Sequence, residues 1–196
     1  MILSNTPLPT VFEISDIAFP DEFNRSYLDS LDFHNLFKNS NSLREICYDT
    51  EQHKHLYSPI IDELGEKFKE KLIELRDSDF KLWWPGDMFE CLDLNFDSEI
   101  VSTTLLKDSP KFDMGLHVDN GLCIATSVIN ILDQNSHTIY YKDISGNEVL
   151  YAGPSSRGTG IIHLNHPGLW HTGINNDYLD RYTIKVYYGI NHLVCG

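Results

Sequence analysis

The sequence predicts a mainly β protein of the α+β class, in which N-terminal α-helices pack against a sandwich or jelly roll. Helical patterns occur only before about residue 79, and short apolar stretches separated by turn residues fill the rest of the chain. Roughly eight or nine short strands at this spacing are typical of a sandwich or jelly roll. The expected strands span residues 80–84, 88–96, 100–106, 116–118, 122–132, 138–141, 149–151, 160–164 and 182–188.

One long helix dominates the N-terminal part. Ser58 is a suitable N-cap with Pro59 in the first turn, and apolar side chains then recur at helical spacing as far as Leu75. A strand is expected over residues 11–19, and a short helix is expected after Pro20. The long helix is expected to support a sheet.

The chain is expected to form one domain over residues 1–196. The polar, Asn- and Ser-rich stretch 32–52 is interpreted as a loop, and no repeat or linker marks a second domain. Within the domain, residues 1–79 or so would form the N-terminal helical support. Residues from about 80 to 192 would form the β core.

Composition disfavours several classes of partner. The formal net charge of -14 repels the phosphates of nucleic acids and anionic membrane surfaces, and no segment has the pattern of a signal peptide or membrane span. The four cysteines lie apart, without a Cys-x-x-Cys pair, which favours reduced thiols and a cytoplasmic location. We therefore expect duplex nucleic acid to be an unlikely partner and no membrane to be involved, and the sequence leaves the oligomeric state open. The cysteines are Cys47, Cys91, Cys123 and Cys195.

A His-x-Asp motif, His117 and Asp119, provides the first indication of chemistry. In an extended strand, side chains two residues apart point to the same face, so this imidazole and carboxylate would point together. The best candidate for a third ligand from a distant strand is His171, with Arg181 ten positions later. Two histidines and one carboxylate form the facial triad that suits ferrous iron and leaves positions open for a co-substrate and oxygen. Alone, the motif is weak, because roughly one such triplet is expected by chance.

The final expected strand begins with Arg181. Alternation places Arg181, Thr183 and Lys185 on one face. A buried guanidinium needs a partner, and a dicarboxylate co-substrate would provide one through a bidentate contact to Arg181 and a hydrogen bond from Thr183. Lys185 could contact the same co-substrate or extend to solvent at a sheet edge.

From residue 115 to 188 the chain resembles the iron(II)- and 2-oxoglutarate-dependent dioxygenases, and most closely their prolyl-4-hydroxylase-like branch. The matching features are the His-x-Asp motif, a strand that begins with Gly-Thr at 158–162, the distal histidine and the strand 181–188. The resemblance implies a double-stranded β-helix of the cupin-like jelly-roll type. It also implies hydroxylation of a small-molecule or peptide substrate with release of succinate and CO2, and ascorbate is a candidate reductant.

The resemblance further implies a role for each site residue. Iron would bind His117, Asp119 and His171, and Arg181 would hold the distal carboxylate of 2-oxoglutarate. Asn130 stands where prolyl hydroxylases usually carry a tyrosine that helps to hold 2-oxoglutarate, and its amide could still donate a hydrogen bond. The Gly-Gly that usually precedes the following strand is replaced by Asn-Ser-His in this sequence.

Alternatives remain open at this point. His163 and His166 are rival third ligands, although they fit a hydrogen-bonded strand histidine and a turn residue, and Arg181 could pair with Asp177 or Asp180 instead of a ligand. Two other functions also fit the motifs. One is a non-catalytic jelly-roll binding module with a structural metal, and the other is a cupin-type iron dioxygenase that does not use 2-oxoglutarate.

Overall fold

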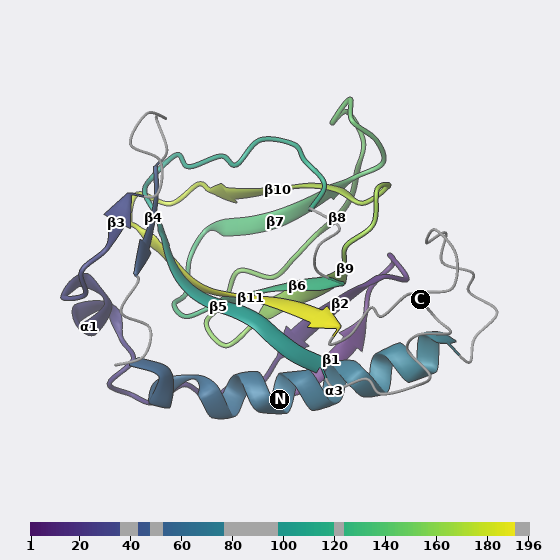
Figure 1. The fold of residues 1–196 in the computed structure, drawn as a ribbon. Coiled ribbons are helices and arrows are strands. Elements are labelled where there is room, and N and C mark those ends of the chain that lie inside the picture. Colours follow the sequence, from purple (N-terminus) through teal and green to yellow (C-terminus); the bar gives the residue numbers. More distant parts are fainter. Residues whose placement is uncertain (36–42, 48–52, 77–97, 120–123, 191–196) are drawn as a thin grey trace.

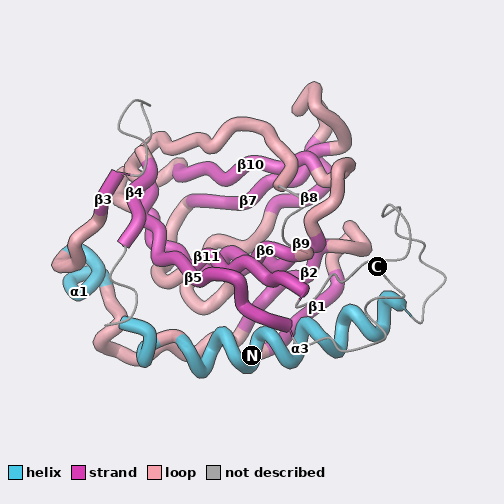
Figure 2. Tube along the Cα trace, in the orientation of Figure 1, coloured by secondary structure: helices cyan, strands magenta, loops and turns pink. Residues whose placement is uncertain are grey.

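The computed structural model describes residues 1–35, 43–47, 53–76, 98–119 and 124–190. Its strands form one eight-stranded and one three-stranded antiparallel sheet, which lie across from each other, and a long helix covers the outer face of the larger sheet (Figure 1). Figure 2 shows the strands filling the centre of the molecule and the helices at its periphery. The predicted fold class, mainly β with N-terminal helices in a jelly-roll arrangement, is confirmed.

The larger sheet draws strands from the whole chain. Its spatial order is β1-β2-β9-β6-β11-β5-β4-β3, and the smaller sheet has the order β10-β7-β8. The larger sheet contains β1 (Ile2–Asn5), β2 (Val11–Ser15), β3 (His34–Asn35), β4 (Arg44–Cys47), β5 (Ser98–Asp108), β6 (Ala125–Asn130), β9 (Gly160–Leu164) and β11 (Arg181–Ile190). The smaller sheet contains β7 (Ser136–Tyr141), β8 (Val149–Ala152) and β10 (Trp170–Asn175).

Helix α3 (Ser58–Arg76) packs against the larger sheet, as its apolar periodicity predicts. Its buried residues Leu64 and Phe68 belong to the main hydrophobic core, and the ring of Phe68 contacts Phe12 of β2 and Tyr188 of β11. Full burial of one such side chain stabilises the fold by about 1.5–3 kcal/mol. The two other helical segments are short: α1 (Arg25–Asp29), with Asn24 as its N-cap, and the 3-10 turn η1 (Lys54–Leu56).

Strand β11 separates the main core from the space between the two sheets. Because successive side chains point to opposite faces, one set of its residues enters the core beneath the helix. The alternate residues Arg181 and Lys185 point toward the space between the sheets. A shift of one residue would exchange the two sets, so the register that buries the core also places these charges inside. The core set comprises Tyr182, Ile184, Val186 and Tyr188.

The N-terminal part differs from the prediction of helical support. It contributes four strands to the larger sheet, and β4 lies within the stretch 32–52 that was expected to be a loop. The sequence of β4 is largely polar, and its charged side chains pair across strands: Arg44 contacts Asp108 and Glu45 contacts Lys107. Contacts with β5 therefore replace the apolar alternation that would identify a strand in the sequence.

Other expected elements differ less. Residues 170–175, which none of the expected strand ranges included, form β10, whereas 116–118 contributes a single bridge instead of a strand. The expected strands at 80–84 and 88–96 lie outside the described residues. Cys47 is buried and unbridged, and the other three cysteines lie outside the described residues. Among the described segments, no helix has the length and apolar character needed to cross a membrane.

Candidate metal centre

His117 and His171 come together through the backbone. The two residues form an isolated antiparallel bridge, in which each backbone N–H donates to the other carbonyl at 2.9 Å. Side chains that lie directly opposite in an antiparallel pair share a face, and the two imidazole rings are 4.4 Å apart between centroids. The pairing of residue 117 with β10 therefore positions both histidines.

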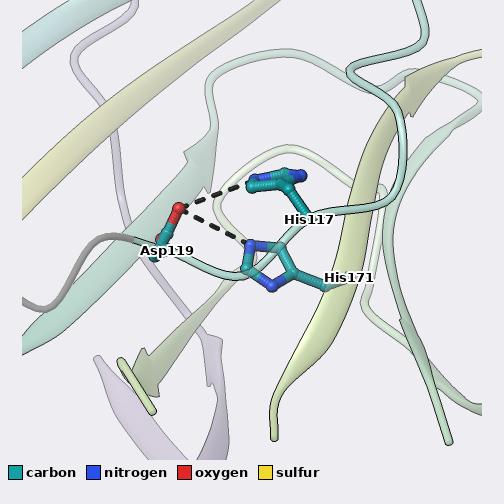
Figure 3. Close-up of side chains that lie close together, drawn as sticks. All are labelled: His117, Asp119 and His171. Atoms are coloured by element: carbon teal, nitrogen blue, oxygen red, sulfur yellow. Dashed lines mark ion pairs between the residues drawn. The ribbon is translucent and has the colours of Figure 1, made fainter. Parts of the chain in front are cut away.

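Asp119 completes a group of three potential metal ligands. Its Oδ1 atom lies 3.6 Å from His117 Nε2 and 3.8 Å from His171 Nε2 (Figure 3). The candidate ligand atoms of these three residues all lie within 4.8 Å of one another. Atoms bound to one ion at about 2.0–2.2 Å lie at most about 4.4 Å apart, and the 3.6 and 3.8 Å separations from Asp119 fall within this limit.

Both histidines hold the tautomer that metal binding requires. His117 Nδ1 lies 2.9 Å from the carbonyl oxygen of Gly115, and His171 Nδ1 lies 2.9 Å from that of Leu169. A carbonyl oxygen only accepts, so each Nδ1 carries the hydrogen and each Nε2 presents a lone pair. His117 Nε2 is buried and has no hydrogen-bond partner among the described residues. An ion between the three side chains would satisfy this atom.

The charge states also suit a metal ion. Burial lowers the pKa of His171 to about 3, with a further contribution from His163, so this imidazole is neutral near pH 7. Burial alone would raise the pKa of Asp119, but His117, His163 and Lys185 outweigh that effect and hold this pKa well below its usual range. A charged carboxylate thus faces the lone pairs of the two histidines.

His163 fixes the other oxygen of Asp119. Its Nε2 lies 3.2 Å from Asp119 Oδ2, and its Nδ1 lies 2.7 Å from the hydroxyl oxygen of Tyr140 in β7. Burial raises the pKa of Tyr140 well above its usual value, so the hydroxyl keeps its proton and can donate it to Nδ1. His163 Nε2–H then donates to Oδ2, which leaves Oδ1 facing His117 and His171.

A cavity between the sheets connects this centre to buried cationic side chains. Besides the three potential ligands and His163, its lining includes Arg44, Arg181 and Lys185. These cations contrast with the net charge of -14 for the whole chain. The cavity therefore suits an anionic ligand.

Arg181 shares a carboxylate with Arg44. Arg44 makes a bidentate contact to the buried Asp108, with Nε to Oδ1 at 2.6 Å and Nη2 to Oδ2 at 2.8 Å. Arg181, only 2% exposed, has its Nη1 3.8 Å from the same Oδ2, and its Nε has no hydrogen-bond partner among the described residues. Burial lowers the pKa of Arg181 to about 10, while Asp108 opposes this shift and Arg44 adds to it. Two guanidinium groups therefore contact one carboxylate.

Comparison with known proteins adds evidence at the level of fold. No protein-family model matches the chain, and no curated protein is similar to it in sequence. Solved structures do match. The non-heme α-ketoglutarate-dependent epimerase SnoN from nogalamycin biosynthesis, in a complex with Fe3+, α-ketoglutarate and nogalamycin RO, has a TM-score of 0.57 at 9% identity, over 92% of this chain and 79% of that chain.

A prolyl hydroxylase from Trichoplax adhaerens, in complex with a peptide fragment of the hypoxia inducible factor oxygen degradation domain, has a TM-score of 0.51 at 13% identity, over 84% of this chain and 73% of that chain. The chain has the fold of the 2-oxoglutarate- and iron-dependent oxygenases. It covers 48% of a further similar structure, an oxidoreductase of the 2OG-Fe(II) oxygenase family from Burkholderia pseudomallei, with a TM-score of 0.40 at 14% identity.

The residues expected to contact a co-substrate differ in whether they line the cavity. Lys185 lines the cavity in the interior of the larger sheet, between β5 and β6, and not at a sheet edge. Thr183 is buried on the same strand but does not line the cavity. Asn130 does not line it either, because its amide donates to Pro154 O at 2.9 Å and accepts from Gln134 Nε2 at 2.8 Å. The roles of Thr183 and Asn130 toward a co-substrate stay predictions.

Three side chains around this site, Asp108, Arg44 and Tyr140, were not predicted from the sequence. Asp108 follows the apolar pair Leu105–Leu106 at the end of β5, and an acid in that position is a usable signal for a buried partner. Arg44 and Tyr140 have no comparable signal, because their importance depends on contacts with residues far away in the sequence. The alternative partners of Arg181 are now excluded: Asp177 accepts from backbone N–H groups, and Asp180 lies near Lys107.

Proposed function

We propose that the protein is an Fe(II)- and 2-oxoglutarate-dependent dioxygenase that hydroxylates a peptidyl or small-molecule substrate and releases succinate and CO2. One observation supports this proposal above the others. A single cavity joins the His117, Asp119 and His171 ligand set to the buried guanidinium group of Arg181. A dicarboxylate that binds a metal at one end needs this pair of features.

The comparisons support the same chemistry. The epimerase SnoN holds Fe3+ and α-ketoglutarate, and the Trichoplax adhaerens protein is a prolyl hydroxylase bound to a peptide. By analogy we assign Fe(II) and 2-oxoglutarate to this protein, and ascorbate as a reductant. The peptide complex makes a peptide one candidate substrate. The scattered cysteines favour a cytoplasmic location.

The three ligand residues would hold the iron. Iron, when bound there, supplies the activation of oxygen that couples the decarboxylation of 2-oxoglutarate to oxidation of the substrate. His117 and His171 direct their Nε2 lone pairs at the ion because each Nδ1 is fixed to a backbone carbonyl. Asp119 would bind through Oδ1, since Oδ2 accepts from His163. One carboxylate oxygen and two imidazoles leave coordination positions for a bidentate co-substrate and for oxygen.

Arg181 would bind the distal carboxylate of 2-oxoglutarate. Its Nε lacks a hydrogen-bond partner among the described residues, and the carboxylate of Asp108, 3.8 Å from its Nη1, is already held in a bidentate contact by Arg44. A carboxylate of the ligand would supply the missing acceptor. Asp108 would keep Arg181 in place before the co-substrate arrives, which reduces the cost of ordering the side chain on binding.

Oxygen consumption tests the proposal against both alternatives. Metal-free protein is reconstituted with Fe2+ and ascorbate, and oxygen uptake and succinate are measured with and without 2-oxoglutarate; the Asp119→Ala variant provides the background. We expect uptake and succinate only when 2-oxoglutarate is present. Uptake that does not depend on 2-oxoglutarate would identify a cupin-type iron dioxygenase. Tight metal retention without any uptake would identify a binding module.

A further inference from the structure

Lys185 is a buried cation beside the candidate metal centre. The residue is 7% exposed, and its Nζ lies 4.0 Å from Asp119 Oδ1 and 4.7 Å from the centroid of the Tyr187 ring. Neither contact is a hydrogen bond. A buried ammonium group is costly unless an anion accepts its hydrogens, so Lys185 suits a closer anionic partner than the described residues provide.

A metal ion bound at this centre would compete with Lys185 for the carboxylate of Asp119. Asp119 Oδ1 faces the Nε2 atoms of both histidines, and it is therefore the oxygen that a metal ion would take. The divalent ion and the ammonium group would then repel each other across a short distance in a buried site. A second anion on the metal, next to Asp119, would relieve this repulsion and accept hydrogen bonds from Nζ.

We propose that Lys185 binds the carboxylate that a ligand places on the metal. This inference rests on the proposed function and assigns the two ends of the 2-oxo acid: Lys185 contacts the carboxylate next to the 2-oxo group, and Arg181 contacts the distal one. The two residues lie four positions apart on one face of β11, so about 13 Å separate their Cα atoms. Their long side chains can therefore converge on opposite ends of one extended dicarboxylate.

Ligands that lack the distal carboxylate can distinguish the contact made by Lys185 from the contact made by Arg181. We would load the protein with Mn2+, which occupies the site without oxygen chemistry, and measure binding by calorimetry. The probes are 2-oxoglutarate, 2-oxopentanoate, in which a methyl group replaces the distal carboxylate, and oxalate, which chelates a metal and has no distal group. The variants are Lys185→Met and Arg181→Met. Lys142→Met is the control, because Lys142 is an exposed lysine paired with Glu148.

The expected changes in affinity depend on which end of the ligand each residue contacts. Lys185→Met weakens the binding of all three probes by about 10- to 100-fold, the range for loss of a charge-assisted hydrogen bond. Arg181→Met weakens only the binding of 2-oxoglutarate, and Lys142→Met leaves all three affinities unchanged. Without any ligand, Lys185→Met binds Mn2+ at least as tightly as the wild type, because it lacks the repelling charge. General damage to the site would instead weaken metal and ligand together.

Two results would overturn the assignment. One is undiminished binding of oxalate and 2-oxopentanoate by Lys185→Met, and the other is a loss confined to 2-oxoglutarate, which would put Lys185 at the distal end. If Lys185→Met fails to fold, Lys185→Gln is measured against the same predictions. Wild-type protein that binds oxalate in a Lys185-dependent manner but not 2-oxoglutarate would refute the proposed co-substrate and retain the role of Lys185.

Discussion

His163 holds one oxygen of Asp119 at 3.2 Å while the hydroxyl of Tyr140 holds the opposite side of the His163 ring at 2.7 Å. Tyr140 and His163 are buried and the Asp119 side chain is only 9% exposed, so water has little access to the two hydrogen bonds. The chain Tyr140–His163–Asp119 leaves Asp119 Oδ1 as the oxygen that faces the two histidine ligands. The orientation of the carboxylate is thus set before a metal ion binds.

The first prediction concerns His163. His163→Phe removes the hydrogen bond to Asp119 Oδ2, and the carboxylate is then free to rotate. We expect the affinity for Fe2+ or Mn2+ to fall by about 10- to 100-fold, as is typical when a group that orients a metal ligand is lost. Competition with a chromophoric chelator measures this affinity.

A matched control distinguishes this effect from general damage to a strand. His137 is a β7 histidine whose Nδ1 bonds to the carbonyl oxygen of Gly153, and it does not line the cavity. His137→Phe should leave metal affinity unchanged. Equal metal affinities for wild type and His163→Phe would show that Asp119 needs no support from His163.

The three potential ligands were predicted from the sequence, but the secondary structure expected around them differs from the one observed. His117 and Asp119 were expected in one strand, whereas residue 117 forms only a single bridge, and none of the expected strand ranges included His171, which belongs to β10. The residue types and their order in the chain were sufficient to select the group. The pairing of 117 with 171 spans 54 residues, and no local pattern encodes such a contact.

The positions of Arg44 and Asn130 could not be predicted because they also depend on contacts between distant residues. Arg44 belongs to the site only because β4 pairs with β5, which brings it to Asp108, 64 positions away. Asn130 aligned with a family tyrosine, yet its amide bonds to Pro154 and Gln134 at the end of β6. In both cases tertiary neighbours determine where the side chain points. By contrast, apolar periodicity alone predicted α3 and its buried face.

The second prediction tests the ligand set. His117→Ala and Asp119→Ala each remove one of three metal ligands, and we expect both to lose the conversion of 2-oxoglutarate to succinate in the presence of Fe2+ and ascorbate. Removal of metal from the wild type with a chelator should have the same effect and should be reversed by Fe2+. The assay is succinate formation without added substrate. Normal turnover by either variant would refute the assignment.

The third prediction concerns Asp108, which is fully buried between Arg44 and Arg181. Asp108→Ala leaves the buried guanidinium group of Arg181 and the partly buried one of Arg44 without their shared carboxylate. Loss of one member of a buried ion pair typically costs about 3–5 kcal/mol of unfolding free energy. Urea denaturation should show a loss of this size.

Arg181→Met provides the comparison for Asp108. It removes one of the two cations and leaves the bidentate contact between Asp108 and Arg44, so a smaller loss of stability is expected. The same variant should need a much higher concentration of 2-oxoglutarate for turnover while it retains metal. If Arg181→Met destabilised the fold more than Asp108→Ala, the shared-carboxylate arrangement would be wrong.

The last prediction follows from the pKa of His171, which burial lowers from 6.5 to about 3. Between these two values the unfolded chain binds a proton that the folded apoprotein does not. The unfolding free energy therefore falls as the pH decreases from about 6.5 toward 3, by up to about 1.4 kcal/mol per pH unit for one such group. Burial also lowers the pKa of His163, which gives a contribution of the same sign.

Urea denaturation of metal-free protein at pH 7, 6 and 5 measures this dependence on pH. The stability of His171→Leu, which has no group to protonate at this position, should fall less steeply over the same interval. If the metal-free wild type and His171→Leu lost stability in parallel, His171 would not be the neutral, buried imidazole that the proposed metal centre requires.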